Sequence, residues 1–349
     1  IRRPPRSTPL YSSAASDVYK RQMMKTTEMI SIRSLLVASV ALGVSQVVVA
    51  QQSTGANSIM PWAYVLNDPD AQTGEVPDPD EVVSVPGSDV SMPRSAININ
   101  AGPPDWHPEG HPPMPEVVAS GGGEGVVACG YCHLPNGQGK PENASVAGQP
   151  YDYIVQQMTD WRNGLRKTGE PRMGPPSFME RIGLAATDEE ARIAAEYFSS
   201  ISFRPWIRVV ETDMVPETQF AGWIHEVIEG GSMEPIGTRI VETPEDLTRT
   251  KLRDDASSFV AYVPTGSVER GRRLAEVDRC AVCHGEGLRG LGPVPALAGR
   301  SPSYVARQLY DFQQGTRNGA WSDLMDSAVA DLSIEDIVNL SAYTASLTP

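Results

Sequence analysis

Four cysteines and two histidines are the residues most able to do chemistry, and they occur in two identical patterns. They are Cys129, Cys132, His133, Cys280, Cys283 and His284. Each group reads C-x-x-C-H, which is the attachment signature of a c-type haem. On a helix, positions i, i+3 and i+4 share one side, so two thiols can meet the vinyl groups of one porphyrin while the histidine meets its iron. The sequence therefore predicts two covalently bound haems.

Three other uses of paired cysteines fit this sequence less well. A thioredoxin-like redox pair needs a βαβ context, which is absent here. A zinc site built from two C-x-x-C pairs keeps them roughly 15–20 residues apart, and the separation here is far longer. Structural disulfides suit an oxidising compartment but do not require a histidine after each pair.

The two signatures belong to an internal repeat. Residues 153–166 match residues 304–317 without gaps, and Tyr, Gln, Asp, Gly and Arg recur at the same positions. The shared apolar spacing predicts an amphipathic helix in each copy. Thr187 and Ser333 each begin a pattern typical of a capping box, which predicts closing helices that run to about residues 200 and 347. An opening helix is expected before Cys280, where Gly271 would allow close contact with Tyr343.

Together these features resemble the class I cytochromes c, and the pair of repeats is similar to the two-domain di-haem cytochromes c. The resemblance implies a methionine as the distal iron ligand in each domain. Met179 and Met325 each lie eight residues before the start of a closing helix. Met173 lies in the same expected loop as Met179 and is an alternative ligand. Histidine and methionine together raise the potential of a haem relative to two histidines.

One position departs from the family pattern. Family members often place a proline near the proximal histidine; Pro295 fits this, but the first repeat has Ala144 there. We expect that loop to be held differently in the first domain. The remaining histidines, His107, His111 and His225, are interpreted as loop or surface residues.

The predicted fold class is mostly α, with two tandem class I cytochrome c domains joined by a small β-rich insert. β-prone runs occur at 206–211, 221–226, 238–242 and 259–263. The expected divisions are a non-native leader at 1–22, a signal peptide at 23–50, an extended arm at 51–112, domain one at 113–203, the connector at 204–264 and domain two at 265–349. We expect the arm to pack on the first domain.

The apolar run that ends at Ala50 is short for a spanning helix, which favours a cleaved signal and a periplasmic protein; an uncleaved anchor is the alternative. Residues 51–349 hold 22 basic and 41 acidic residues, a net charge of −19. That charge argues against nucleic acid and suits a basic redox partner. The predicted function is electron transfer between redox partners, among them a membrane-bound oxidase or dehydrogenase. The alternatives are a cytochrome subunit of a larger dehydrogenase or oxidase, and a di-haem peroxidase.

Overall fold

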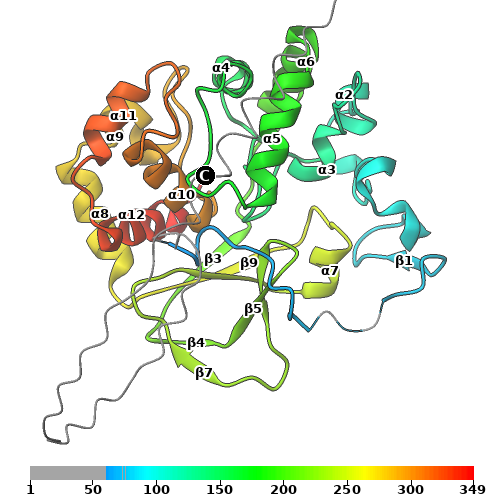
Figure 1. Ribbon diagram of the computed structural model, residues 1–349, viewed down its shortest axis with the longest axis horizontal. Helices are drawn as coiled ribbons and strands as arrows, with labels where there is room; N and C mark the ends of the chain where they lie inside the picture. Colours follow the sequence, from blue (N-terminus) through cyan, green and yellow to red (C-terminus); the bar gives the residue numbers. More distant parts are fainter. Residues whose placement is uncertain (1–59, 73, 75) are drawn as a thin grey trace, which may run out of the picture. The chain divides into compact units, whose positions relative to one another are not determined.

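The computed structural model describes residues 60–349 except 73 and 75 (Figure 1). The predicted leader at 1–22 and signal peptide at 23–50 lie outside the described residues, as do residues 51–59 of the arm. Within the described part of the chain, no helix combines the length and apolar character needed to cross a membrane.

The two repeats contain helices in the same order. In the first repeat these are α2 (Glu116–Ala119), α3 (Cys129–His133), α4 (Tyr151–Arg162), α5 (Gly174–Ala185) and α6 (Asp188–Ser200). In the second they are α8 (Ser267–Val277), α9 (Ala281–His284), α10 (Pro302–Gln313), α11 (Ser322–Val329) and α12 (Ile334–Ser346). Four short 3-10 helices lie at Arg94–Ala96, Ile99–Ala101, Pro108–Gly110 and Glu286–Leu288.

Both closing helices begin with the predicted capping box. The Thr187 hydroxyl accepts a hydrogen bond from the Glu190 backbone N–H, and the Glu190 carboxylate accepts one from the Thr187 N–H. Ser333 and Asp336 make the same reciprocal pair at the start of α12. Each box satisfies two backbone donors that a helix start would otherwise leave without partners.

The predicted opening helix of the second repeat is α8, and it packs against α12 (Figure 1). A Cβ atom added at Gly271 would lie 2.0 Å from the Asn339 carbonyl oxygen and 2.7 Å from the Tyr343 Cβ. The contact predicted between Gly271 and Tyr343 is therefore confirmed. The counterpart in the first repeat, α2, has only four residues.

The segment between the repeats contains seven strands and one helix. They are β3 (Ile207–Glu211), β4 (Met214–Pro216), β5 (Thr218–Ala221), β6 (Ile224–Val227), β7 (Met233–Pro235), β8 (Val241–Pro244), α7 (Leu247–Lys251) and β9 (Phe259–Val263). β9 is the central strand of one sheet, parallel to β3 and antiparallel to β8. β4 pairs with β7 and β5 with β6, and a separate hairpin joins β1 (Val82–Ser84) to β2 (Ser91–Pro93).

The β-prone runs at 206–211 and 259–263 correspond to β3 and β9. The run at 221–226 was wrong as a single strand, because Gly222 and Trp223 have positive φ angles and form the turn between β5 and β6. The run at 238–242 corresponds to β8, which begins later than expected, at Val241. Residues 174–185, expected as part of a loop, form α5.

One apolar core joins the arm, the strands, the second repeat and Met173 of the first repeat. Its buried residues include Met60, Trp62, Tyr64, Ile240, Val263, Ala306 and Ile337. The Tyr64 hydroxyl donates to Asp311 at 2.6 Å, and Arg307 donates to the Ala63 carbonyl at 2.7 Å. The expectation that the arm packs on the first domain is met only in part at residues 60–64, because their core contains Met173 of the first repeat together with residues of the strands and the second repeat. Further along, Met114 does pack against the core of the first repeat.

Candidate functional site

The two attachment sequences occupy equivalent short helices. α3 spans Cys129–His133, and α9 begins directly after Cys280 and ends at His284. All four cysteines are free of disulfides. Burial raises the pKa of Cys129 to about 12 and also raises the pKa of Cys132 and Cys280.

Each histidine is oriented by a hydrogen bond from its own loop. His133 Nδ1 lies 2.8 Å from the Ala144 carbonyl oxygen, and His284 Nδ1 lies 2.8 Å from the Pro295 carbonyl oxygen. Since a carbonyl can only accept, Nδ1 carries the proton and Nε2 is the nitrogen that can ligate a metal. We expected Ala144 to change how this loop is held. At the hydrogen bond to the histidine the two loops are the same, because a backbone carbonyl accepts from Nδ1 in both repeats.

The chemistry of this donor set fits a c-type haem. Burial lowers the pKa of both His133 and His284, which keeps the imidazoles neutral as iron ligands must be. The two cysteines of each signature lie on the same short helix or at its start. When bound, the haem supplies one-electron redox chemistry, while the protein sets its potential through ligands and burial.

The methionines occupy different environments. Met179 lies on α5 and Met325 on α11, both half-buried and both on the helix before a closing helix. Met173 is 0% exposed and lies in the core shared with Met60 and Trp62. This packing engages Met173 on the side of the arm and strands.

The chain is similar to known c-type cytochromes. No protein-family model matches the chain. The chain is 29% identical over 237 residues to cytochrome c4 of Azotobacter vinelandii, covering 66% of this chain and 89% of the relative. It is 35% identical over 72 residues to cytochrome c-554(548) of Halomonas halodenitrificans, covering 20% of this chain and 87% of that relative.

The chain belongs to the two-domain di-haem cytochromes c. It carries two covalently bound haems, and its function is electron transfer. A protein of Stutzerimonas stutzeri named thiosulfate dehydrogenase electron acceptor is 24% identical over 236 residues, which cover 66% of this chain and 85% of that relative.

The two halves of this cytochrome meet through a mirrored network of repeated residues. Arg166 donates to Gln157 at 2.9 Å, to Tyr304 at 2.9 Å and to Gln308 at 3.0 Å. Arg317 donates to Gln308 at 3.1 Å, to Tyr153 at 2.9 Å and to Gln157 at 3.0 Å. Arg166 and Arg317 also form a backbone bridge. The repeated Tyr, Gln and Arg positions therefore bind one repeat to the other.

The loops that orient the two histidines are also held against each other. Arg300 donates to the Ser145 carbonyl at 3.1 Å, one residue beyond the Ala144 carbonyl that holds His133. The Gln149 side chain donates to the Ala296 carbonyl and accepts from its N–H, both at 3.0 Å, one residue beyond Pro295. Each repeat thus fixes the histidine loop of the other. Gln149 and Arg300 were not predicted from the sequence, because the two repeats carry different residue types at this matched position.

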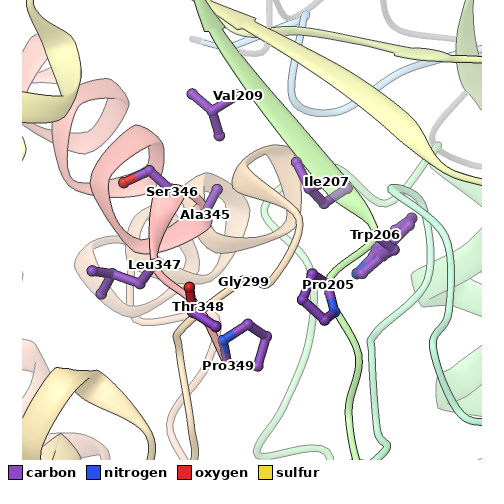
Figure 2. Close-up of a pocket in the computed structure, with 10 residues that line it drawn as sticks. All are labelled: Pro205, Trp206, Ile207, Val209, Gly299, Ala345, Ser346, Leu347, Thr348 and Pro349. Carbon is purple, nitrogen blue, oxygen red and sulfur yellow. The ribbon is translucent and has the colours of Figure 1, made fainter.

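A surface cavity is lined in part by Gly299, which precedes Arg300. Figure 2 shows it between the start of β3 and the end of α12, with Trp206, Ile207, Ala345 and Pro349 among its lining residues. None of its lining residues is a cysteine, histidine or methionine, so this cavity is not a haem site.

The interpretation of three histidines as loop or surface residues is wrong for His225, whereas His107 and His111 lie in loops. His225 lies on β6, is 4% exposed, and contacts Thr218 Oγ1 and the Trp62 carbonyl. The His111 side chain is also buried, with its Nε2 3.2 Å from Asp105. Only His107 remains partly accessible in its loop.

Proposed function

We propose that this cytochrome shuttles single electrons between redox partner proteins in the periplasm, after export by the signal segment at 23–50. Cys129 and Cys132 attach the first haem, and Cys280 and Cys283 attach the second. His133 with Met179, and His284 with Met325, are the axial ligands. The observation that carries the proposal is the pair of identical 2.8 Å bonds that hold the two histidines.

The proposed domains are 113–203 and 265–349, with residues 51–112 as an arm and 204–264 as a β-rich connector. The interlocked histidine loops support a fixed arrangement of the two haem sites, since movement of one loop would break bonds to the other. Strand β8 and the start of α10 are joined by Glu242, which accepts hydrogen bonds from Ser301 and Ser303. We expect the connector to act as a rigid spacer.

Neither haem site is proposed to be catalytic. A di-haem enzyme needs an iron with an open or displaceable distal position, whereas Met179 and Met325 occupy matching helices. The relative named as an electron acceptor of thiosulfate dehydrogenase supports a dehydrogenase as the donor. Negative charge on the mature chain would favour a basic docking surface on that donor.

Optical spectra of the matured protein test this function. Two haems per chain, with the near-infrared methionine–iron band at twofold intensity in the oxidised form, are expected. Met179→Leu and Met325→Leu should each remove half of that band, because leucine fills similar space but cannot ligate iron. Met173→Leu is the control and should leave the band intact. A high-spin signal or a single band in the unmodified protein would overturn the assignment and favour an enzyme.

A further inference from the structure

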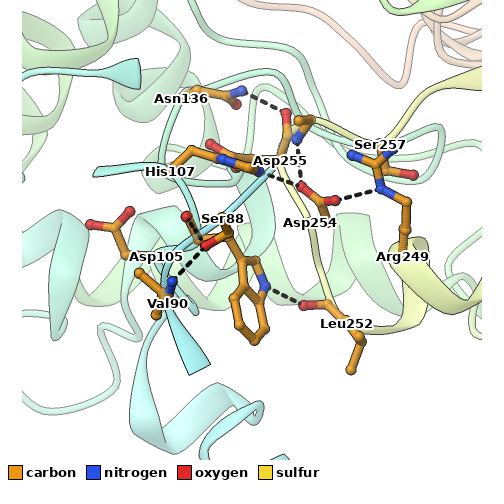
Figure 3. A network of polar contacts seen from close by, with 12 residues as sticks. Ser88, Val90, Asp105, His107, Asn136, Arg249, Leu252, Asp254, Asp255 and Ser257 are labelled. Carbon is orange, nitrogen blue, oxygen red and sulfur yellow. Dashed lines mark hydrogen bonds and ion pairs between the residues drawn. The ribbon is translucent and has the colours of Figure 1, made fainter. Parts of the chain in front are cut away.

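A buried group of acidic side chains and a histidine lies where the arm meets the connector, outside both haem sites. His107, Asp254 and Asp255 each place one potential ligand atom within 4.8 Å of the others. Figure 3 shows the three side chains converging from the arm and from the loop after α7. His107 Nε2 is 3.1 Å from Asp254 Oδ1.

The side chain of Asp255 is the strongest indication of a ligand at this place. It is 3% exposed, and its Oδ1 has no hydrogen-bond partner. Burial raises its pKa to about 6; His107 and His111 act to lower this pKa, whereas the carboxylates of Asp254 and Asp105 act to raise it. A buried carboxylate without a cationic partner is costly, and it is neutralised either by a proton or by a metal ion.

Hydrogen bonds fix the Asp254 carboxylate in an orientation suited to binding a metal ion. Arg249 donates to its Oδ2 at 2.6 Å, and the Ala256 N–H donates to its Oδ1 at 2.9 Å. The partners of a metal-ligating carboxylate fix its orientation in the same way. Arg249 neutralises the carboxylate of Asp254, whereas the carboxylate of Asp255 keeps its negative charge.

The spacing suits a small divalent ion. Two ligands that each lie about 2.1 Å from one zinc ion are about 3.0–3.4 Å apart when they are neighbours. The distance from His107 to Asp254 falls in this range. An imidazole with carboxylates is a donor set that zinc accepts, whereas calcium takes six to eight oxygens.

We propose that His107, Asp254 and Asp255 bind one divalent cation of the zinc class, separate from the haem irons. The site is close to the first haem-attachment segment, because Asn136, three residues after His133, donates from its side chain to the Asp255 carbonyl at 2.7 Å. A bound ion would join the arm to the connector at this point.

The chain simplifies the test because it has five histidines. His133 and His284 are assigned to haem, and His225 and His111 have both ring nitrogens in polar contacts. Histidine-dependent zinc binding by an untagged, haem-loaded protein therefore reports on His107. Zinc chloride alone is the probe, with calcium chloride as the comparison.

Isothermal titration calorimetry should find that one zinc ion binds per chain and that calcium binds more weakly. The Tm should rise with zinc concentration. Asp255→Asn and His107→Gln should each weaken zinc binding at least tenfold. Asp255→Asn removes an unpaired buried charge, so it is expected to fold. Glu109→Gln is the control, because the Glu109 carboxylate is exposed and 3.9 Å from His107. The zinc affinity of this variant should stay within twofold of the wild type. No zinc binding at 1 mM, equal affinity for calcium, or unchanged affinity in Asp255→Asn would each overturn the proposal.

Discussion

The first haem-attachment segment is covered by other parts of the chain, and the second faces outward. The Arg253 guanidinium lies 3.9 Å from the ring centre of Tyr131, and Gln138 donates to the Ser257 carbonyl at 3.3 Å. In the second repeat, Val282 is 67% exposed and Val277 is 75% exposed. The same five-residue motif therefore has two different surroundings.

The sequence motif therefore determines how each haem is attached, whereas the surroundings of the motif determine the redox potential of that haem. Both histidines make the same 2.8 Å bond, so the proximal geometry is shared. Solvent exposure and neighbouring charge tune the potential of a haem even when its ligands are the same. One sequence pattern, repeated within a chain, can thus produce two unequal redox centres.

The largest expected effect comes from removing the thiols of one repeat. Cys280→Ser with Cys283→Ser should lower the haem count from two to one per chain, and so should Cys129→Ser with Cys132→Ser. Serine cannot form the thioether, and the other repeat keeps its own thiols. A pyridine haemochrome assay measures the count. A count of two would contradict the attachment, and a count of zero in both variants would contradict the independence of the repeats.

The mirrored arginines test whether the repeats are equal at their contact. Arg166→Met and Arg317→Met each remove three hydrogen bonds from a buried cation, so each should lower the free energy of unfolding by about 4 kcal/mol. Urea denaturation measures the change. Arg273→Met is the control: Arg273 is exposed and pairs only with Glu269, so a change within about 0.5 kcal/mol is expected. A loss below about 1 kcal/mol at Arg166 would contradict the role of the network.

Glu242 tests how firmly the second repeat is joined to the connector. Burial raises its pKa from 4.5 to about 7, although Ser301 and Ser303 donate to it. The folded protein therefore binds this proton more tightly than the unfolded chain. Stability from this group is present below pH 4.5 and is lost as the pH rises to about 7, by at most about 3 kcal/mol.

Glu242→Gln should remove this loss. Between pH 5 and pH 8, the stability of the wild type should fall relative to the variant by about 2–3 kcal/mol in urea denaturation. Glu245→Gln is the control, because Glu245 is half-exposed and pairs with Arg208 at 2.8 Å. A variant that follows the pH dependence of the wild type would show that Glu242 stays ionised.

The smallest effect separates the two capping boxes. Glu190 accepts from the Gly123 N–H at 2.8 Å in addition to its box partners, whereas Asp336 serves the box alone. Glu190→Ala should therefore destabilise the protein by about 1 kcal/mol more than Asp336→Ala. Thermal unfolding followed by circular dichroism measures both. Equal losses would mean that the bond to Gly123 contributes nothing.

Much of the site could be predicted from sequence because it depends on neighbours along the chain. The thiols and histidine of each signature, the capping boxes and the amphipathic helices all arise from separations of three or four residues. The recurrence of the motif then predicted two domains and two haems. The Gly271 contact also followed from pattern alone, since a glycine on an apolar helix face indicates close packing.

Other features depend on residues that are far apart in the chain, and only the tertiary structure decides them. Met173 and Met179 look alike in sequence, yet packing against the arm buries the first completely. The arm itself joins the second repeat through Tyr64 and Asp311, which are 247 residues apart. Apolar faces can pack in many combinations that local pattern does not distinguish. The charge state of buried groups such as Glu242 and Asp255 follows from that packing.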